Sequence, residues 1–134
     1  MSASALVDLD SRLDSGDASA ALAAVWDVLD LVAELCDRIT FDEGCDELQA
    51  MIAAQKCVEA RDFLPLPTSG EPVAPSTPAP GAAGLAPYAH LLERVSETLT
   101  RLSADSLDVD PTSLRRGAEL SAGAAAATTR IREA

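Results

Sequence analysis

The sequence predicts an all-α protein, in which two antiparallel helical hairpins form a four-helix bundle with a short extra N-terminal helix and a Pro-rich crossover linker. Alanine, the residue with the highest helix propensity, fills 26 of the 134 positions. Only Trp26, Phe41, Phe63 and Tyr88 are aromatic, so residues that favour strands are scarce. Apolar residues recur three and four positions apart, which is the spacing of an amphipathic helix. A chain of this length fits one domain.

Two helices are predicted before residue 40. Residues 4–14 place three leucines on one face and form a short first helix. Asp17 is a suitable N-cap for the helix over residues 18–39, because its carboxylate can accept hydrogen bonds from N–H groups of the first turn. The apolar positions of this helix alternate three and four apart, as in helices that pack against one another. They are Leu22, Val25, Leu29, Val32, Cys36 and Ile39.

A third helix is predicted over residues 42–63, with Thr40 as its cap and with Asp42 and Glu43 at its positive end. We expect its apolar side chains at helical spacing to form its buried face. These residues are Leu48, Met51, Ile52, Ala54 and Val58. With the two preceding helices, the third makes residues 1–63 the N-terminal acidic part of the domain.

Residues 64–86 differ in composition from the rest of the chain. Seven of the eight prolines lie between positions 65 and 87, among Gly, Ser, Thr and Ala. Proline lacks the backbone N–H that a helix uses and restricts the preceding residue to extended geometry. We therefore predict a linker that joins residues 1–63 to a second helical hairpin, residues 87–134, within one domain.

The second hairpin is predicted to contain helices over residues 87–104 and 111–133. Pro87 suits the first turn of one helix, and Asp110 followed by Pro111 suits the start of the other. The first of these helices has a leucine-rich face. The second has a face of small residues, which bury little apolar area each. We expect this last helix to be the least stable element unless a neighbour packs closely against it.

The formal net charge is −12, from 22 acidic and 10 basic residues. Residues 1–63 carry −10 of this charge, whereas residues 87–134 carry only −1. Basic residues drive binding to nucleic acid and to anionic membrane surfaces, so we expect neither partner. The sequence shows no membrane-spanning apolar run and no signal-peptide pattern, which predicts a cytoplasmic protein. The arginine-rich and alanine-rich composition is typical of a high-GC bacterial genome, such as that of an actinobacterium.

The sequence offers no catalytic constellation. Cys36, Cys45 and Cys57 lie nine and twelve residues apart, whereas zinc sites usually take ligands in pairs two to four residues apart. His90 is the only histidine, and the acidic turn at residues 41–47 lacks the spacing of an EF-hand calcium loop. We expect a protein that is not an enzyme, with reduced thiols and without a metal or cofactor.

Four acidic residues of the second helix suggest a binding surface. Asp27, Asp30, Glu34 and Asp37 lie three, four and three positions apart, which places them on one side of the helix. Such a stripe either is a solvated face or docks a basic protein surface, because complementary charge speeds and orients association. We predict that these residues, with Trp26 beside them as an apolar anchor, bind another protein. The sequence leaves open whether the chain also forms a homodimer.

A small-molecule sensor or carrier is an alternative to this adaptor or regulator role. A pocket lined by Ala and Leu between the two hairpins would hold the ligand, and Tyr88 or His90 would supply polar contacts.

A third hypothesis about function comes from residues 107–131, with the sequence LDVDPTSLRRGAELSAGAAAATTRI. Its features are Val109, Asp110, Pro111 and Leu114, followed by alanines from Ala118. In these features it resembles the opening helix of EspC-like proteins, which are associated with ESX (type VII) secretion in actinobacteria. The resemblance implies a helical, partner-dependent protein linked to that secretion system.

Overall fold

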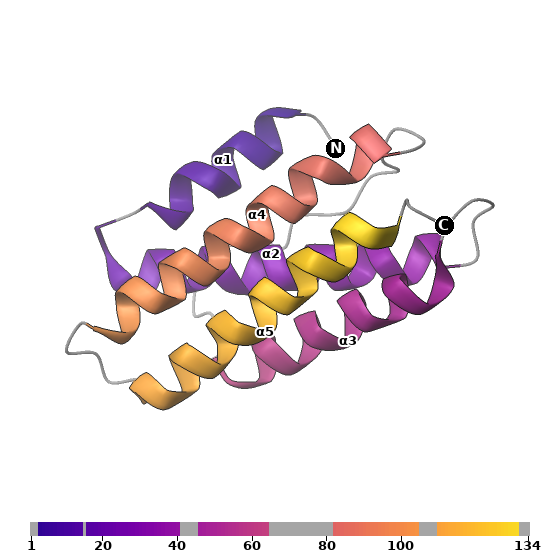
Figure 1. Ribbon diagram of the computed structural model, residues 1–134. Coiled ribbons are helices and arrows are strands. Elements are labelled where there is room, and N and C mark those ends of the chain that lie inside the picture. Colours follow the sequence, from indigo (N-terminus) through magenta and orange to yellow (C-terminus); the bar gives the residue numbers. More distant parts are fainter. Residues whose placement is uncertain (1–2, 15, 41–45, 65–81, 105–109, 132–134) are drawn as a thin grey trace.

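The computed structural model describes residues 3–14, 16–40, 46–64, 82–104 and 110–131. Its five helices are α1 (Ala3–Leu13), α2 (Ala18–Ile39), α3 (Glu47–Asp62), α4 (Ala82–Ser103) and α5 (Pro111–Arg130) (Figure 1). These ranges contain no strand, so the predicted all-α class is confirmed. None of the helices in them is long and apolar enough to cross a membrane.

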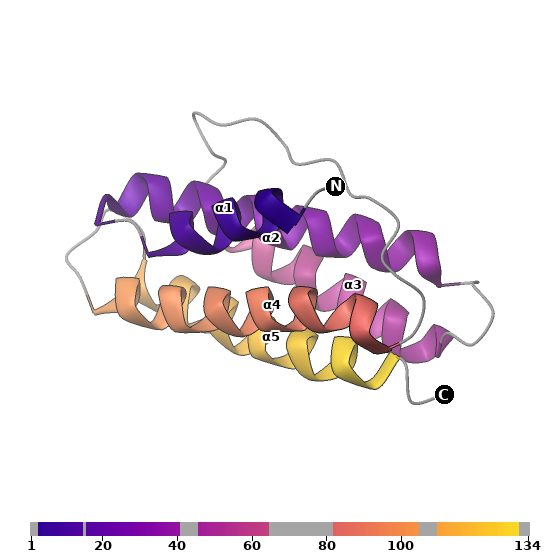
Figure 2. The same ribbon diagram turned by 90° about the horizontal axis from the view of Figure 1, so that it is seen from above.

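The helices lie side by side with their axes roughly aligned (Figures 1 and 2). α5 packs against α4 and α3, and α2 packs against α3 and α4. α2 and α5 run in one direction while α3 and α4 run in the other, so each of these contacts joins antiparallel helices (Figure 1). α3 therefore ends at the opposite end of the molecule from the start of α4, which accounts for the long connection between them. α1 lies against α2 and α4.

Two of the predicted helix starts are confirmed. Asp17 is the N-cap of α2 and accepts a hydrogen bond from the backbone N–H of Ser19. Asp110 is the N-cap of α5 and accepts from the N–H of Thr112, with Pro111 in the first turn. Each carboxylate thus satisfies a backbone donor that has no partner within its helix.

The start of α3 was predicted too early. The helix begins at Glu47, and its N-cap is Asp46, whose carboxylate accepts from the N–H of Gln49. Thr40 does not cap α3. It is the C-cap of α2, and its hydroxyl donates a 2.7 Å hydrogen bond to the carbonyl of Cys36. Residues 42–45, the predicted start of this helix, lie outside the described residues.

The start of α4 was predicted too late. The helix begins at Ala82, so residues 82–86 of the predicted linker are helical and Pro87 lies inside the helix. A proline at this position removes one backbone hydrogen bond near the helix start. Leu85, in the added first turns, is buried, and this burial offsets the lost bond. The remainder of the predicted linker, residues 65–81, lies outside the described residues.

The predicted buried face of α3 is wrong. The helix buries only Ala50, Ala53, Ala54, Cys57 and Ala60, none of which is larger than cysteine. Of the predicted set only Ala54 is buried. Ile52 and Val58 are half-buried, and Leu48 and Met51 are exposed.

The packing partner of α3 explains this inversion. α5 contacts α3, and most of its buried residues are also small, including Gly117, Ser121, Ala124 and Ala127. A Cβ atom placed at Gly117 would lie 3.9 Å from the backbone oxygen of Ala60, so the two backbones pass close together. Large side chains do not fit between helices at that separation. Leu48 and Met51 of α3 are therefore exposed, and Ile52 and Val58 pack only partly against the core.

Candidate protein-interaction surface

The outward side of α3 carries most of the large exposed apolar side chains among the described residues. Leu48 is 64% exposed, Met51 57% and Phe63, at the C-cap of the helix, 41%. The other large exposed apolar residue, Val7, lies on α1 at 64%. The sequence indicates such a surface, because apolar residues occur on all sides of the third helix and cannot all be buried. Hydrophobicity alone predicts that the larger ones are core residues.

The structure divides the predicted acidic stripe of α2 into two pairs. Asp27 is only 6% exposed, and its carboxylate is 2.9 Å from Nη2 of Arg12 on α1. Asp30 is half-buried and lies 2.7 Å from Nη1 of Arg61 on α3. Both carboxylates thus join α2 to a neighbouring helix, which sequence spacing alone could not reveal.

The other two acids of the stripe face solvent. Glu34 is exposed and forms a 3.5 Å ion pair with Arg38 one turn along the same helix. Asp37 is also exposed. Ion pairs between exposed side chains contribute little to stability, so both carboxylates are accessible to an external cation.

Trp26 lies at the junction between α2 and α3. The indole is half-buried, and the guanidinium carbon of Arg61 lies 5.2 Å from the ring centroid. At this distance the cation interacts with the negative face of the ring. A hollow of about 430 Å³ opens beside the indole and is lined by Trp26, Arg61, Asp62 and Leu64.

The contacts of Arg61 set how α2 and α3 align. Arg61 meets Asp30, and because the helices are antiparallel, the N-terminal part of α3 lies beside the C-terminal part of α2. Asp37 lies two turns beyond Asp30, and Met51 lies two turns before Val58, so each pair shares one side of its helix. The solvent-facing sides of the two helices form one surface, which we call the α2–α3 face. It comprises Trp26, Asp30, Glu34, Asp37, Leu48, Met51, Val58 and Asp62.

The α2–α3 face combines apolar area with negative charge. The face has four carboxylates, and the same two helices carry two arginines. Arg38 pairs with Glu34, and Arg61 pairs with Asp30. The remaining charge of this surface is therefore negative. This distribution matches the concentration of acidic residues in the first half of the sequence.

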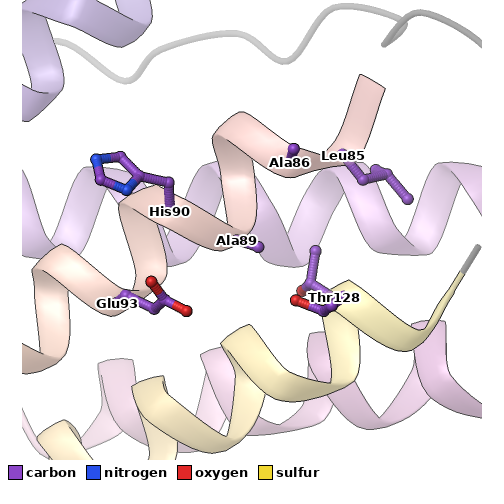
Figure 3. Close-up of a pocket in the computed structure, with 7 residues that line it drawn as sticks. Leu85, Ala86, Ala89, His90, Glu93 and Thr128 are labelled. Atoms are coloured by element: carbon purple, nitrogen blue, oxygen red, sulfur yellow. The ribbon is translucent and has the colours of Figure 1, made fainter. Parts of the chain in front are cut away.

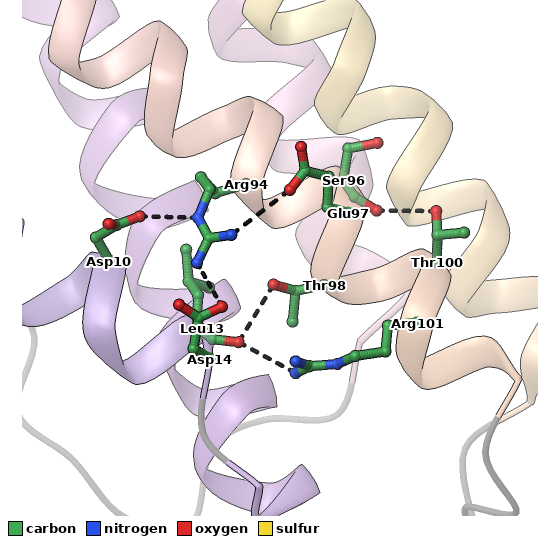
Figure 4. Close-up of polar contacts among 9 residues, drawn as sticks. All are labelled: Asp10, Leu13, Asp14, Arg94, Ser96, Glu97, Thr98, Thr100 and Arg101. Carbon is green, nitrogen blue, oxygen red and sulfur yellow. Dashed lines mark hydrogen bonds and ion pairs between the residues drawn. The ribbon is translucent and has the colours of Figure 1, made fainter.

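A second polar cluster holds α1 in place and is shown in Figure 4. Arg94 on α4 forms ion pairs with Asp10 at 3.0 Å and with Asp14 at 2.5 Å. The hydrogen bond from Arg94 lowers the pKa of Asp14 below its usual value. The backbone carbonyl of Leu13 accepts hydrogen bonds from the hydroxyl of Thr98 at 3.3 Å and the guanidinium of Arg101 at 3.2 Å. These contacts anchor α1 to α4.

A smaller hollow lies between α4 and α5 (Figure 3). Its volume is about 230 Å³, and His90, Glu93 and Thr128 supply polar groups to its lining. Ligand pockets usually enclose roughly 300–1,000 Å³, so this hollow would hold only a small ligand. It lies within the second hairpin, not between the hairpins as predicted, and Tyr88 is buried in the core away from it.

The described cysteines are core residues. Cys36 and Cys57 are both buried, and burial raises the pKa of the Cys57 thiol well above its usual value, as does the neighbouring Cys36. A thiol with a raised pKa is a poor nucleophile and a poor metal ligand at neutral pH. Within the described ranges, no group of three or more His, Cys, Asp or Glu residues could hold a metal ion. Cys45 lies outside those ranges.

Comparison of the chain with protein-family models, with curated proteins and with solved structures found no match.

Proposed function

We propose that the protein acts by binding another protein through the α2–α3 face and catalyses no reaction itself. The observation that carries this proposal is the inverted orientation of α3, which buries alanines and exposes Leu48 and Met51. Exposed apolar side chains gathered on one face, with polar groups around them, are typical of protein-binding surfaces. The solvated carboxylates Glu34 and Asp37 favour a partner with a basic surface.

We further propose that α2, α3, α5 and α4 constitute a four-helix bundle with a single crossover, and that α1 is an addition to it. The closed sequence of antiparallel contacts α2–α3, α3–α5, α5–α4 and α4–α2 supports this arrangement. In such a bundle the function of α3 is twofold. Its small residues close the core, and its large ones remain available to a partner.

Affinity capture from the native host tests this function. The tagged chain and the double variant Leu48→Gln/Met51→Gln are compared at low salt, with bound proteins identified by mass spectrometry. Glutamine retains helix propensity, so α3 remains folded while its apolar area is lost. Val7→Gln is the matched control, because Val7 is as exposed as Leu48 but lies on α1.

We expect specific partners to be lost from the double variant and retained by the control. Circular dichroism verifies that all three proteins remain helical. An identical set of partners for the double variant and the unchanged chain would contradict the proposal.

Small-molecule binding at the hollow between α4 and α5 is a second candidate. The polar groups of His90 and Glu93 beside Thr128 favour it. A metabolite screen by thermal shift tests it, with His90→Ala as the variant. A ligand that stabilises the unchanged chain but not His90→Ala would support this candidate, and no stabilisation by any metabolite would count against it.

A further inference from the structure

We infer that the partner docks on the α2–α3 face as a basic amphipathic helix, which lies along α3 with its apolar side on Leu48 and Met51. This inference rests on the proposed function and adds the chemistry of the partner. Three properties of the face lead to it, namely its backbone, its length and its charge.

The backbone of the α2–α3 face is already hydrogen-bonded within two helices. An extended peptide gains affinity by pairing its N–H and C=O groups with a sheet edge, and these helices offer no such groups. A partner segment that packs on this face must therefore satisfy its own backbone. A helix does so, and it presents side chains every three or four residues to match the spacing on α3.

The length of α3 suits a short docked helix. Its 16 residues extend about 24 Å, which accommodates roughly four turns of a partner. Leu48 and Met51 lie towards one end of this surface. The hollow beside Trp26 lies towards the other end and can receive a larger side chain.

The charge of the face selects a basic partner and disfavours a second copy of the chain. Glu34, Asp37 and Asp62 are exposed on this face, and both arginines nearby pair with acids. Two copies that met through this face would oppose like charges on a protein with a net charge of −12. Lysine or arginine residues that flank the apolar side of a partner helix would instead pair with these carboxylates.

Fluorescence anisotropy with two labelled peptides tests the inference on the full-length chain. The basic peptide has about 18 residues, with leucines at i, i+3, i+4 and i+7 spacing and lysines on both flanks. The acidic peptide has glutamate at each lysine position. We expect the basic peptide to bind at least about tenfold more tightly, with an affinity that falls as salt is added. Trp26 fluorescence provides a second readout at the face.

Two double variants connect the binding to the α2–α3 face. Leu48→Gln/Met51→Gln should lower the affinity for the basic peptide about tenfold or more, because apolar contact is lost. Glu34→Gln/Asp37→Asn should lower the affinity for this peptide about three- to tenfold and reduce the salt dependence of binding.

The matched control for charge is Asp8→Asn/Glu119→Gln, which removes the same charge from exposed acids on α1 and α5. It should change affinity less than about twofold, because these acids lie outside the face. An equal loss in both charge variants would show attraction to the net charge alone and would overturn the inference.

The remaining outcomes separate this inference from the proposed function. Equal binding of the acidic and basic peptides, or no binding of either, overturns the inference of a basic helix. Host partners that are still lost from Leu48→Gln/Met51→Gln would then leave the protein-binding function intact. A dimer of the unchanged chain in sedimentation analysis that dissociates in Leu48→Gln/Met51→Gln would identify a second copy as the occupant, and would also overturn the inference.

Discussion

The carboxylates of α2 have different roles although they share one helix. Asp27 and Asp30 pair with arginines of other helices, at 2.9 and 2.7 Å, and Asp27 is buried while Asp30 is half-buried. Glu34 and Asp37 are exposed and contribute to the negative charge of the α2–α3 face. Their spacing along the sequence is regular, so the difference comes from the neighbouring helices. Arg12 on α1 and Arg61 on α3 each reach one acid.

The pair between Arg12 and Asp27 should matter for stability. In Arg12→Ala the buried carboxylate of Asp27 loses its partner, and we expect the free energy of unfolding to fall by about 1–3 kcal/mol. In Arg38→Ala the pair with Glu34 is exposed, and the loss should be below about 0.5 kcal/mol. Urea unfolding followed by Trp26 fluorescence measures both. Equal losses would contradict the distinction between the two pairs.

At the scale of elements, α3 and α5 pack through small residues and approach closely. The face of small residues on α5 was expected to need a closely packed neighbour. Both α3 and α4 pack against α5. Two glycines of α5 differ in what an added methyl group would meet. At Gly117 it lies 3.2 Å from Cδ1 of the fully buried Leu99. At Gly123 it meets only the flexible side chain of Lys56, at 3.0 Å.

The same substitution should therefore have different effects at the two glycines. Gly123→Ala should raise the free energy of unfolding by up to about 1 kcal/mol, because alanine favours the helix and Lys56 can move aside. Gly117→Ala should gain less or lose stability, because Leu99 is confined by the core. Thermal and urea unfolding compare the two variants. If Gly117→Ala stabilised as much as Gly123→Ala, the close packing of α5 would be refuted.

The ion pairs of Arg94 help to hold α1 in place, so the docking of α1 should depend on pH. The hydrogen bond from Arg94 makes the pKa of Asp14 lower in the folded protein than in the unfolded chain. Ionised Asp14 therefore stabilises docked α1 fully above the unfolded value of about 4. This contribution disappears as the pH falls through the lowered folded value.

Amide hydrogen exchange measures this effect. Corrected for intrinsic rates, the protection of α1 should fall in acid before that of α4. In Arg94→Gln, α1 should be less protected even at neutral pH, because the pairs with Asp10 and Asp14 are lost. Simultaneous loss of protection in both helices, unchanged by the substitution, would contradict a separately docked α1.

At the scale of the whole molecule, charge and packing are distributed unevenly. The buried leucines of the helices come from α1, α2, α4 and α5, whereas α3 buries only alanines and a cysteine. The acidic residues are concentrated in the first half of the chain. Because α3 is at once the helix with the smallest buried residues and part of the acidic half, apolar and negative groups coincide on the α2–α3 face. The proposed protein binding uses this coincidence.

The sequence by itself determined the all-α class and the extent of the best-capped helices. α2 follows from the cap at Asp17 and a regular apolar repeat, and the start of α5 follows from Asp110 and Pro111. These features act within one or two helical turns, so local propensity and capping are sufficient to predict them.

Only the tertiary structure decided which side of α3 is buried and which acids of α2 remain exposed. Apolar residues lie on all sides of α3, and hydrophobicity alone favoured Leu48 and Met51 as core. The close approach of α5 reversed that choice, because the space between the two backbones admits only small side chains. In the same way, Arg12 and Arg61 pair with their acids across 15 and 31 residues of sequence. Such contacts depend on how helices pack, which no local pattern specifies.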